Sequence, residues 1–260
     1  MKIEFFDCNV RLGRANNPND SKIHTAVEIT AHMKYCGIKG ALIFHNQALS
    51  DWRGGNERLA AEISGISNLH GCAVVVPSCT GEYEADTYFK ELANADFKAI
   101  RMFPRLNNFS LKPYSVEETF KGALKYHFPV ILDFIDYNDS MLPYSTWDFS
   151  PDYDAIFELA HAFPQNRFII VLPGMQTQRK QYALLAKTDN VYLECSSFGF
   201  GTIEHICNNF GSEKLVFGTY TPILEPGAFM TYINYADIPI EDKIAIAGRN
   251  VERLLGIAHE

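Results

Sequence analysis

Residues 129–134 read PVILDF and residues 167–172 read RFIIVL, and both runs are apolar at nearly every position. A strand with one face in water alternates apolar and polar residues, whereas a strand covered on both faces does not. Unbroken apolar runs of this length are therefore typical of a parallel sheet that is covered by helices. The rest of the chain repeats this pattern.

Eight short apolar runs alternate with segments in which apolar residues recur at helical spacing. We predict strands at 3–9, 38–45, 72–77, 97–103, 129–134, 167–172, 190–196 and 214–219. We predict helices at 21–36, 51–69, 83–94, 115–127, 151–163, 177–188, 201–210 and 239–256. Parallel strands need such crossovers, and eight units in 260 residues fit an α/β fold with one domain over 1–260, a (β/α)8 TIM barrel. A doubly wound open sheet is the alternative, although no G-x-G-x-x-G motif opens the first helix.

Local signals predict where several helices begin or end. Asp20 or Ser21 is suited to cap the first helix, and Gly37 follows that helix as a stop signal. The run Ser-Val-Glu-Glu at 115–118 has the spacing of a capping box. The pair Pro-Asp at 151–152 suits the first turn of another helix.

The composition is that of a folded protein with a large core, since 47% of the residues are apolar and only 21% are charged. The formal net charge of −8 argues against a nucleic-acid partner, because no basic stripe is available to neutralise phosphates. No signal peptide is visible, and no apolar run reaches the roughly 20 residues that a bilayer span needs. We therefore expect a cytoplasmic protein without a membrane partner, whose six cysteines are reduced.

A barrel of this type carries its functional groups at the carboxyl ends of its strands. The first strand ends in the run Asp7-Cys8-Asn9-Val10-Arg11. Simple alternation places Asp7, Asn9 and Arg11 on one face of the strand and Cys8 and Val10 on the other. The first three therefore enter the candidate site together.

Polar residues at the ends of other strands complete the candidate site. We assign the catalytic role of general base to Asp133 or His45, which end the fifth and second strands. Paired N–H groups of arginine suit a carboxylate or phosphate, so the substrate would be anionic. The candidate substrate-binding residues are Asn9, Arg11, Arg101, Glu194 and Tyr220. For each of these residues, a structural ion pair, hydrogen bond or packing contact is the alternative explanation.

Six segments follow one another in an order shared with a known family. They are FFDCNVRLG at 5–13, PVILDF at 129–134, FPQNRFIIVLPG at 163–174, NVYLECSS at 190–197, KLVFGTYTP at 214–222 and IAGRNVERLLG at 246–256. Together they resemble the amidohydrolase-related group of metal-dependent barrel hydrolases and decarboxylases. Because the segments span nearly the whole chain, the resemblance implies the barrel of that family.

The same resemblance implies where the metal of that family would be bound. The corresponding positions are Asn9, Arg11, Asp133, Tyr220 and either Leu172 or Pro173. None of them is a histidine, and zinc needs three or four nitrogen, sulfur or carboxylate ligands. A fixed charge on Arg11 would also repel a cation at short range. We therefore expect neither a catalytic metal nor another cofactor.

Three functions remain open. The first is a metal-independent hydrolase acting on a small anionic substrate such as a lactone, ester or amide of a carboxylic acid, because the wider family includes a lactonase-type hydrolase without bound metal. The alternative is a catalytically inactive pseudoenzyme or ligand-binding barrel. The third is a metal enzyme with ligands elsewhere, for example His24, His32 or His45. Self-association is a further expectation, through outer helices or through the aromatic residues of 134–149, which could instead cover the pocket.

Overall fold

The computed structural model describes residues 3–14, 23–135, 151–174, 177–199 and 201–257. Its eight strands are β1 (Phe5–Leu12), β2 (Ile38–His45), β3 (Leu69–Val74), β4 (Phe97–Met102), β5 (Val130–Leu132), β6 (Phe168–Ile170), β7 (Val191–Glu194) and β8 (Leu215–Val216). Strands that are consecutive in the chain are neighbours in the sheet, and every pair is parallel. The predicted α/β barrel with eight parallel strands is confirmed.

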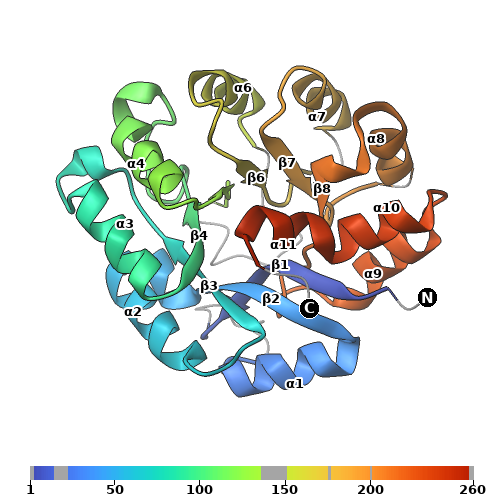
Figure 1. Cartoon of the computed structure of the whole chain (residues 1–260), viewed down its shortest axis with the longest axis horizontal. Coiled ribbons are helices and arrows are strands. Elements are labelled where there is room, and N and C mark those ends of the chain that lie inside the picture. The colour runs from blue at the N-terminus through green and yellow to red at the C-terminus, as the bar shows by residue number, and fades with distance from the viewer. Residues whose placement is uncertain (1–2, 15–22, 136–150, 175–176, 200, 258–260) are drawn as a thin grey trace.

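Backbone hydrogen bonds join the first strand to the last. The amide of Cys8 donates to the carbonyl oxygen of Phe217 at 2.9 Å, and the amide of Arg11 donates to that of Thr221 at 2.8 Å. A parallel bridge also joins Val10 to Thr221. These contacts close the sheet on itself, so that the strands form a ring with the helices outside it (Figure 1).

Helices follow each strand, and the last three of the described helices come after β8. They are α1 (Ala26–Cys36), α2 (Trp52–Ile63), α3 (Ala85–Asn94), α4 (Pro113–Lys125), α6 (Tyr153–Ala162), α7 (Gln178–Leu185), α8 (Thr202–Phe210), α9 (Pro226–Tyr235), α10 (Ile240–Ile244) and α11 (Asn250–Leu255). Short turns lie at η1 (Asn46–Leu49), η2 (Ser78–Thr80), η5 (Ser212–Lys214) and η6 (Ala245–Arg249), the last with π-helical bonding. Among the helices of the described ranges, none is long and apolar enough to cross a membrane.

Two of the predicted helix starts differ from the structure. Asp20 and Ser21 lie outside the described residues, and α1 instead begins after Thr25, which forms a capping box with Glu28. The capping box predicted at 115–118 is wrong, because α4 already begins at Pro113. Proline has its φ angle preset for the first helical turn, so this helix starts two residues before the expected cap.

Other boundary signals are confirmed. Gly37 ends α1 with a left-handed φ of 80°, a conformation that favours glycine. The pair Pro151-Asp152 marks the start of α6 but precedes its first turn, because Asp152 is the cap and accepts a hydrogen bond from the amide of Ala155 at 3.0 Å. The predicted helix at 239–256 is present but is interrupted by η6, and α9 was not predicted.

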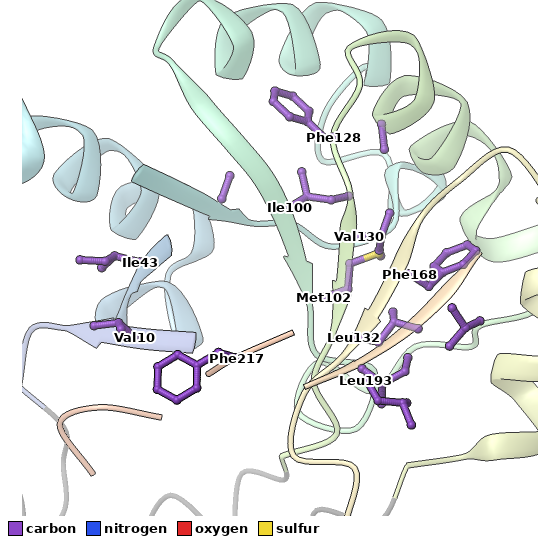
Figure 2. Close-up of a cluster of buried hydrophobic side chains, with 14 of the residues drawn as sticks. Val10, Ile43, Ile100, Met102, Phe128, Val130, Leu132, Phe168, Leu193 and Phe217 are labelled. Atoms are coloured by element: carbon purple, nitrogen blue, oxygen red, sulfur yellow. The ribbon is translucent and has the colours of Figure 1, made fainter. Parts of the chain in front are cut away.

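Buried apolar side chains form two clusters, one on each face of the sheet. The outer cluster packs strands against helices and includes Val10, Ile43, Ile100, Leu132 and Phe217 (Figure 2). The inner cluster fills the barrel with the following side chains: Phe6, Cys8, Leu42, Phe44, Cys72, Val74, Ala99, Phe103, Ile131, Ile169, Val171, Tyr192 and Val216. Burial on both faces explains why the strands are apolar at nearly every position. All six cysteines are free.

The helix α11 covers one end of the barrel and thereby places the candidate site at the other. Its Val251 and Leu254 belong to the inner cluster. Its Asn250 donates to the carbonyl oxygen of Leu215, where β8 begins, at 2.8 Å. Figure 1 shows α11 lying across the ring of strands. The end at which the strands begin is therefore closed by apolar packing, and the polar residues lie at their carboxyl ends.

We predict that Asn56 is needed to hold α2 against β3. Its amide accepts from the backbone N–H of Val74 at 2.8 Å and donates to the carbonyl oxygen of Val74 at 2.7 Å. Asn56→Ala leaves both buried backbone groups without these partners, so the free energy of unfolding should fall by about 2–3 kcal/mol. Urea unfolding measures this loss. Asn209→Ala, which removes an exposed side chain of α8, is the control, and equal losses in the two variants would contradict the prediction.

Candidate functional site

Polar side chains that are almost completely buried fill the barrel at the carboxyl ends of the strands. They are Asp7, Asn9, Arg11, Arg101, Asp133, Glu194, Thr219, Tyr220 and Thr221, and each is at most 3% exposed. We call this set the mouth cluster. Buried polar groups must be paired, so the hydrogen bonds within the cluster determine which groups are available to a ligand.

The strand β1 contains an irregularity where it contributes residues to the mouth cluster. The pairing of β1 with β2 shifts register between Asp7 and Val10. Cys8 belongs to the inner apolar cluster, whereas Val10 belongs to the outer one. The prediction that Cys8 and Val10 share a face is therefore wrong, because a β-bulge breaks the simple alternation. The bulge allows Cys8 and Asn9 to contribute to the barrel interior in succession.

Arg101 and Asp133 form a buried ion pair at the centre of the cluster. Nε of Arg101 donates to Oδ2 of Asp133 at 3.0 Å, and a second guanidinium nitrogen contacts the same oxygen. That nitrogen also donates to Oδ1 of Asn9 at 2.9 Å. The other oxygen of Asp133 accepts from the backbone N–H of Ile135 at 3.1 Å. Asp133 is thus paired with a guanidinium, which favours a role as counter-ion over a role as general base.

Glu194 is surrounded by hydrogen-bond donors. Its oxygens accept from the backbone N–H of Leu172 at 3.1 Å, from the hydroxyl of Ser196 at 2.8 Å and from the amide of Asn9 at 3.5 Å. Burial raises the pKa of Glu194, and the hydrogen bonds from Ser196 and Leu172 lower it in part. Glu194 therefore organises β1, β6 and β7 around one carboxyl group.

Asp7 joins β1 to the segment after β8. Its Oδ1 accepts from the backbone N–H groups of Asn9 at 2.9 Å and Thr219 at 3.0 Å, and its Oδ2 contacts the hydroxyl of Thr219. Burial raises the pKa of Asp7 from 3.8 to about 7, although the Thr219 and Asn9 hydrogen bonds lower it. The nearby charge of Glu194 acts in the same direction as burial. Asp7 therefore titrates near neutral pH.

Arg11 has no acidic partner in the described part of the chain. Its guanidinium donates to the hydroxyl of Tyr220 at 3.1 Å and contacts the amide oxygen of Asn46. It lies over the rings of Phe44 and Tyr220, at 5.7 and 5.3 Å from their centroids. Burial raises the pKa of Tyr220 to about 12, so this phenol is neutral at physiological pH. Arg11 is thus a buried cation that is held by neutral groups.

Leu172, and not Pro173, bonds to the mouth cluster at the end of β6. The backbone N–H of Leu172 bonds to Glu194 inside the cluster. The carbonyl oxygen of Pro173 accepts from Gln181 of α7 at 2.9 Å, on the outer side of the barrel. Leu172 and Tyr220 have left-handed φ values of 49° and 60°, which are unusual for large side chains. The chain therefore turns sharply at the ends of both β6 and β8.

His45 lies apart from the mouth cluster. Its Nδ1 accepts from the backbone N–H of Gln47 at 3.0 Å, and its Nε2 lies 3.9 Å from Glu62 of α2. A Cβ atom on Gly13 would come within 2.6 Å of the imidazole ring. Burial lowers the pKa of His45. Phe44 faces the interior, so its neighbour His45 faces outward, and the structure does not bring His45 near Asp133.

Two residues that contact Arg11 were not predicted from the sequence. Phe44 packs against both Arg11 and Arg101, with the Arg101 guanidinium 4.2 Å from its ring centroid. Asn46, directly after β2, contacts Arg11. Alternation along β2 could have indicated Phe44 in place of His45, but no sequence signal identifies Asn46. Trp147 and most of the aromatic segment 134–149 lie outside the described residues.

Comparison with known proteins supports the fold. No protein-family model and no curated protein match the sequence. A 5-carboxyvanillate decarboxylase from Sphingomonas paucimobilis has a TM-score of 0.73 and 12% identity, over 99% of this chain and 100% of that one. A dihydroxybenzoic acid decarboxylase from a Polaromonas species was solved with bound manganese and 2-nitroresorcinol. It has a TM-score of 0.75 and 12% identity, over 100% of this chain and 98% of that one. A proposed amidohydrolase from Staphylococcus aureus has a TM-score of 0.71 and 14% identity, over 98% of this chain and 100% of that one.

The chain shares the barrel fold of these solved structures. The resemblance predicted from the six sequence segments is thus confirmed at the level of the fold. At 12–14% identity the likeness establishes the architecture and does not transfer an activity.

The mouth cluster does not fit a metal centre of the kind found with manganese in the Polaromonas structure. Within the described ranges no group of three histidine, cysteine, aspartate or glutamate side chains is placed to hold a metal ion. Asp133 is the one carboxylate at the positions that the resemblance assigned to metal ligands, and its Oδ2 is already bonded to Arg101. A divalent ion would have to displace a guanidinium whose charge repels it.

We predict that Asp7 makes the fold less stable as the pH rises. Its pKa is 3.8 ordinarily and about 7 in the folded protein, so its stabilising contribution is complete below pH 3.8 and is lost as the pH rises through 7. Between pH 5 and pH 8 the loss should be roughly 2–3 kcal/mol. Urea unfolding at several pH values measures it. Asp7→Asn should remove this slope, and parallel profiles for the two proteins would refute the assignment.

Proposed function

We propose that this barrel binds a small carboxylate-bearing molecule at Arg11 and that it does so without a metal ion. The observation that carries the proposal is the environment of Arg11. The side chain is 3% exposed, and among the described residues its guanidinium contacts neutral oxygens and no carboxylate. A buried charge without a counter-charge costs several kcal/mol, and a bound anion would offset this cost.

The surroundings of Arg11 favour an anion that carries a flat, apolar body. The rings of Phe44 and Tyr220 lie against the guanidinium. The contact with Asn46 lies at the partly exposed edge of the cluster, so a carboxylate arriving from solvent can replace the amide oxygen of Asn46. Aromatic carboxylic acids combine a bidentate acceptor with such a body. They are also the compounds named for two of the decarboxylases of similar fold.

Hydrolysis of a lactone or ester without a metal is the second candidate function. Arg11 and Arg101 both pack against Phe44, and two cations in a water-poor site could stabilise an oxyanion. Asp7, with its pKa raised to about 7 by burial, has the basicity that a general base needs at neutral pH. Asp133 and His45 fit this role less well, since Asp133 is paired with Arg101 and His45 faces α2.

We predict that Arg11→Met loses anion binding without losing stability. Benzoate and 2,6-dihydroxybenzoate at about ten times their dissociation constants should stabilise the native protein by about 1.4 kcal/mol, and this gain should vanish in the variant. Because the variant removes a buried charge that has no carboxylate partner among the described residues, its unliganded form should be at least as stable as the native protein. Thermal unfolding with and without ligand measures both effects.

Arg249→Met is the matched control. Arg249 is 57% exposed and pairs with Glu241 on the outside of the barrel, so its replacement should leave the ligand effect unchanged. Loss of the ligand effect in both variants, or its persistence in Arg11→Met, would contradict the proposal.

We predict that any turnover depends on Asp7 as well as on Arg11. A panel of lactones, aryl esters and hydroxybenzoates, assayed for acid or carbon dioxide release, separates hydrolysis and decarboxylation from binding alone. If hydrolysis occurs, Asp7→Asn should lower kcat by about 100-fold or more, the usual contribution of a general base. Turnover that is unchanged in both Asp7→Asn and Arg11→Met would place the reaction outside this site.

A further inference from the structure

Arg101 places a positive charge near the axis of the barrel. It belongs to β4, yet its guanidinium bonds both to Asp133, which follows the neighbouring strand β5, and to Asn9 of β1. β1 and β4 are separated by two strands in the ring, so the side chain reaches across the interior. The side chain is 1% exposed. Its charge is therefore a fixed part of the barrel interior.

The groups around this guanidinium are those that a metal cation would otherwise attract. Asp133 supplies a carboxylate oxygen and Asn9 an amide oxygen. The rings of Phe44 and Phe103 lie 4.2 and 5.4 Å from the guanidinium carbon, which is the arrangement of a cation–π contact. The cluster thus encloses one cation with an anionic oxygen, a neutral oxygen and two aromatic faces.

The second carboxylate of the interior is also engaged. Glu194 lies within 3.5 Å of Asn9, but its oxygens accept from Leu172 and Ser196. Recruiting Glu194 and Asp133 to a divalent ion would break these hydrogen bonds and would leave a buried guanidinium beside the ion. At short range in a poorly solvated interior, repulsion between the two cations would be strong.

We propose that the guanidinium of Arg101 serves as the built-in cation of this barrel, occupying the place between Asn9 and Asp133 that a divalent metal ion would need. The inference concerns the same site as the proposed function and rests on its metal-independent part. Arginine differs from a metal ion in offering N–H donors but no vacant coordination position. Arg101 can therefore orient or stabilise anions, but it cannot ionise a bound water by coordinating it.

The first test measures metal uptake by the native protein. The protein is dialysed to equilibrium against about 0.1 mM MnCl2 or ZnCl2, and its metal content is measured by elemental analysis. We expect less than about 0.1 ion per chain, whereas a protein with a true metal site would bind about one ion per chain. One ion per chain, lost in Asp133→Asn, would overturn the inference. This arm uses no Arg101 variant and stays decisive even if such a variant fails to fold.

The second test asks whether a free guanidinium ion can replace the tethered one. Arg101→Ala leaves Asp133 buried without its partner, so its melting temperature should fall by several degrees. Methylguanidinium at about 10 mM, far below denaturing concentrations, should restore part of that loss by binding the folded state. It should not raise the melting temperature of the native protein.

Arg53→Ala is the matched control for the rescue. Arg53 also lies over aromatic rings, Trp52 and Tyr88, but at the surface near Glu82. Methylguanidinium should give this variant no comparable recovery. Absence of rescue in a folded Arg101→Ala protein, or equal rescue in both variants, would refute the inference. Anion stabilisation through Arg11 is a separate readout, so the failure of either proposal can be recognised independently.

Discussion

The ion pair between Arg101 and Asp133 is the interaction on which the mouth of the barrel depends. Each charge loses several kcal/mol of hydration on burial, and the pair is tolerable only because every group around it is bonded. Oδ1 of Asp133 accepts from the amide of Ile135, the guanidinium reaches Asn9, and Phe44 covers its face. The Arg101 side chain thereby connects β4 to the neighbouring strand β5 and, across the interior, to β1.

The β-bulge in β1 follows from this requirement. A regular strand would turn Asn9 outward once Cys8 points into the barrel, and the Arg101 guanidinium would then lack its amide partner. The register shift between Asp7 and Val10 allows Cys8 to fill the inner core while Asn9 bonds to Arg101 and Glu194. Bulges at strand ends re-aim side chains in this way, often near functional sites.

The sequence predicts the barrel well because the barrel is encoded redundantly. Eight apolar runs and eight crossovers all indicate one topology, so an error in a single boundary, such as the start of α4, leaves the fold unchanged. The site lacks this redundancy. Asn9, Arg11, Arg101, Asp133, Glu194 and Tyr220 could be named from their positions at strand ends, and all of them lie in one cluster. The alternative of a structural ion pair is confirmed for Arg101 and Asp133. The hydrogen bonds of Asn9 could not be predicted, because they depend on the bulge in β1. His45 was assigned to the site only because it ends β2. Side chains alternate along a strand, so His45 lies on the face opposite to that of Phe44, outside the barrel interior.

Strained backbone at two strand ends is linked to the hydrogen bonds of the mouth cluster. Leu172 and Tyr220 adopt left-handed φ values, which cost of order 1–3 kcal/mol for such residues. The turn serves the barrel, since it directs the Leu172 amide to Glu194 and the Tyr220 hydroxyl to Arg11. Each turn thus places one hydrogen-bonding group against a charged group of the mouth cluster, so the strain at both strand ends is offset by hydrogen bonds inside that cluster.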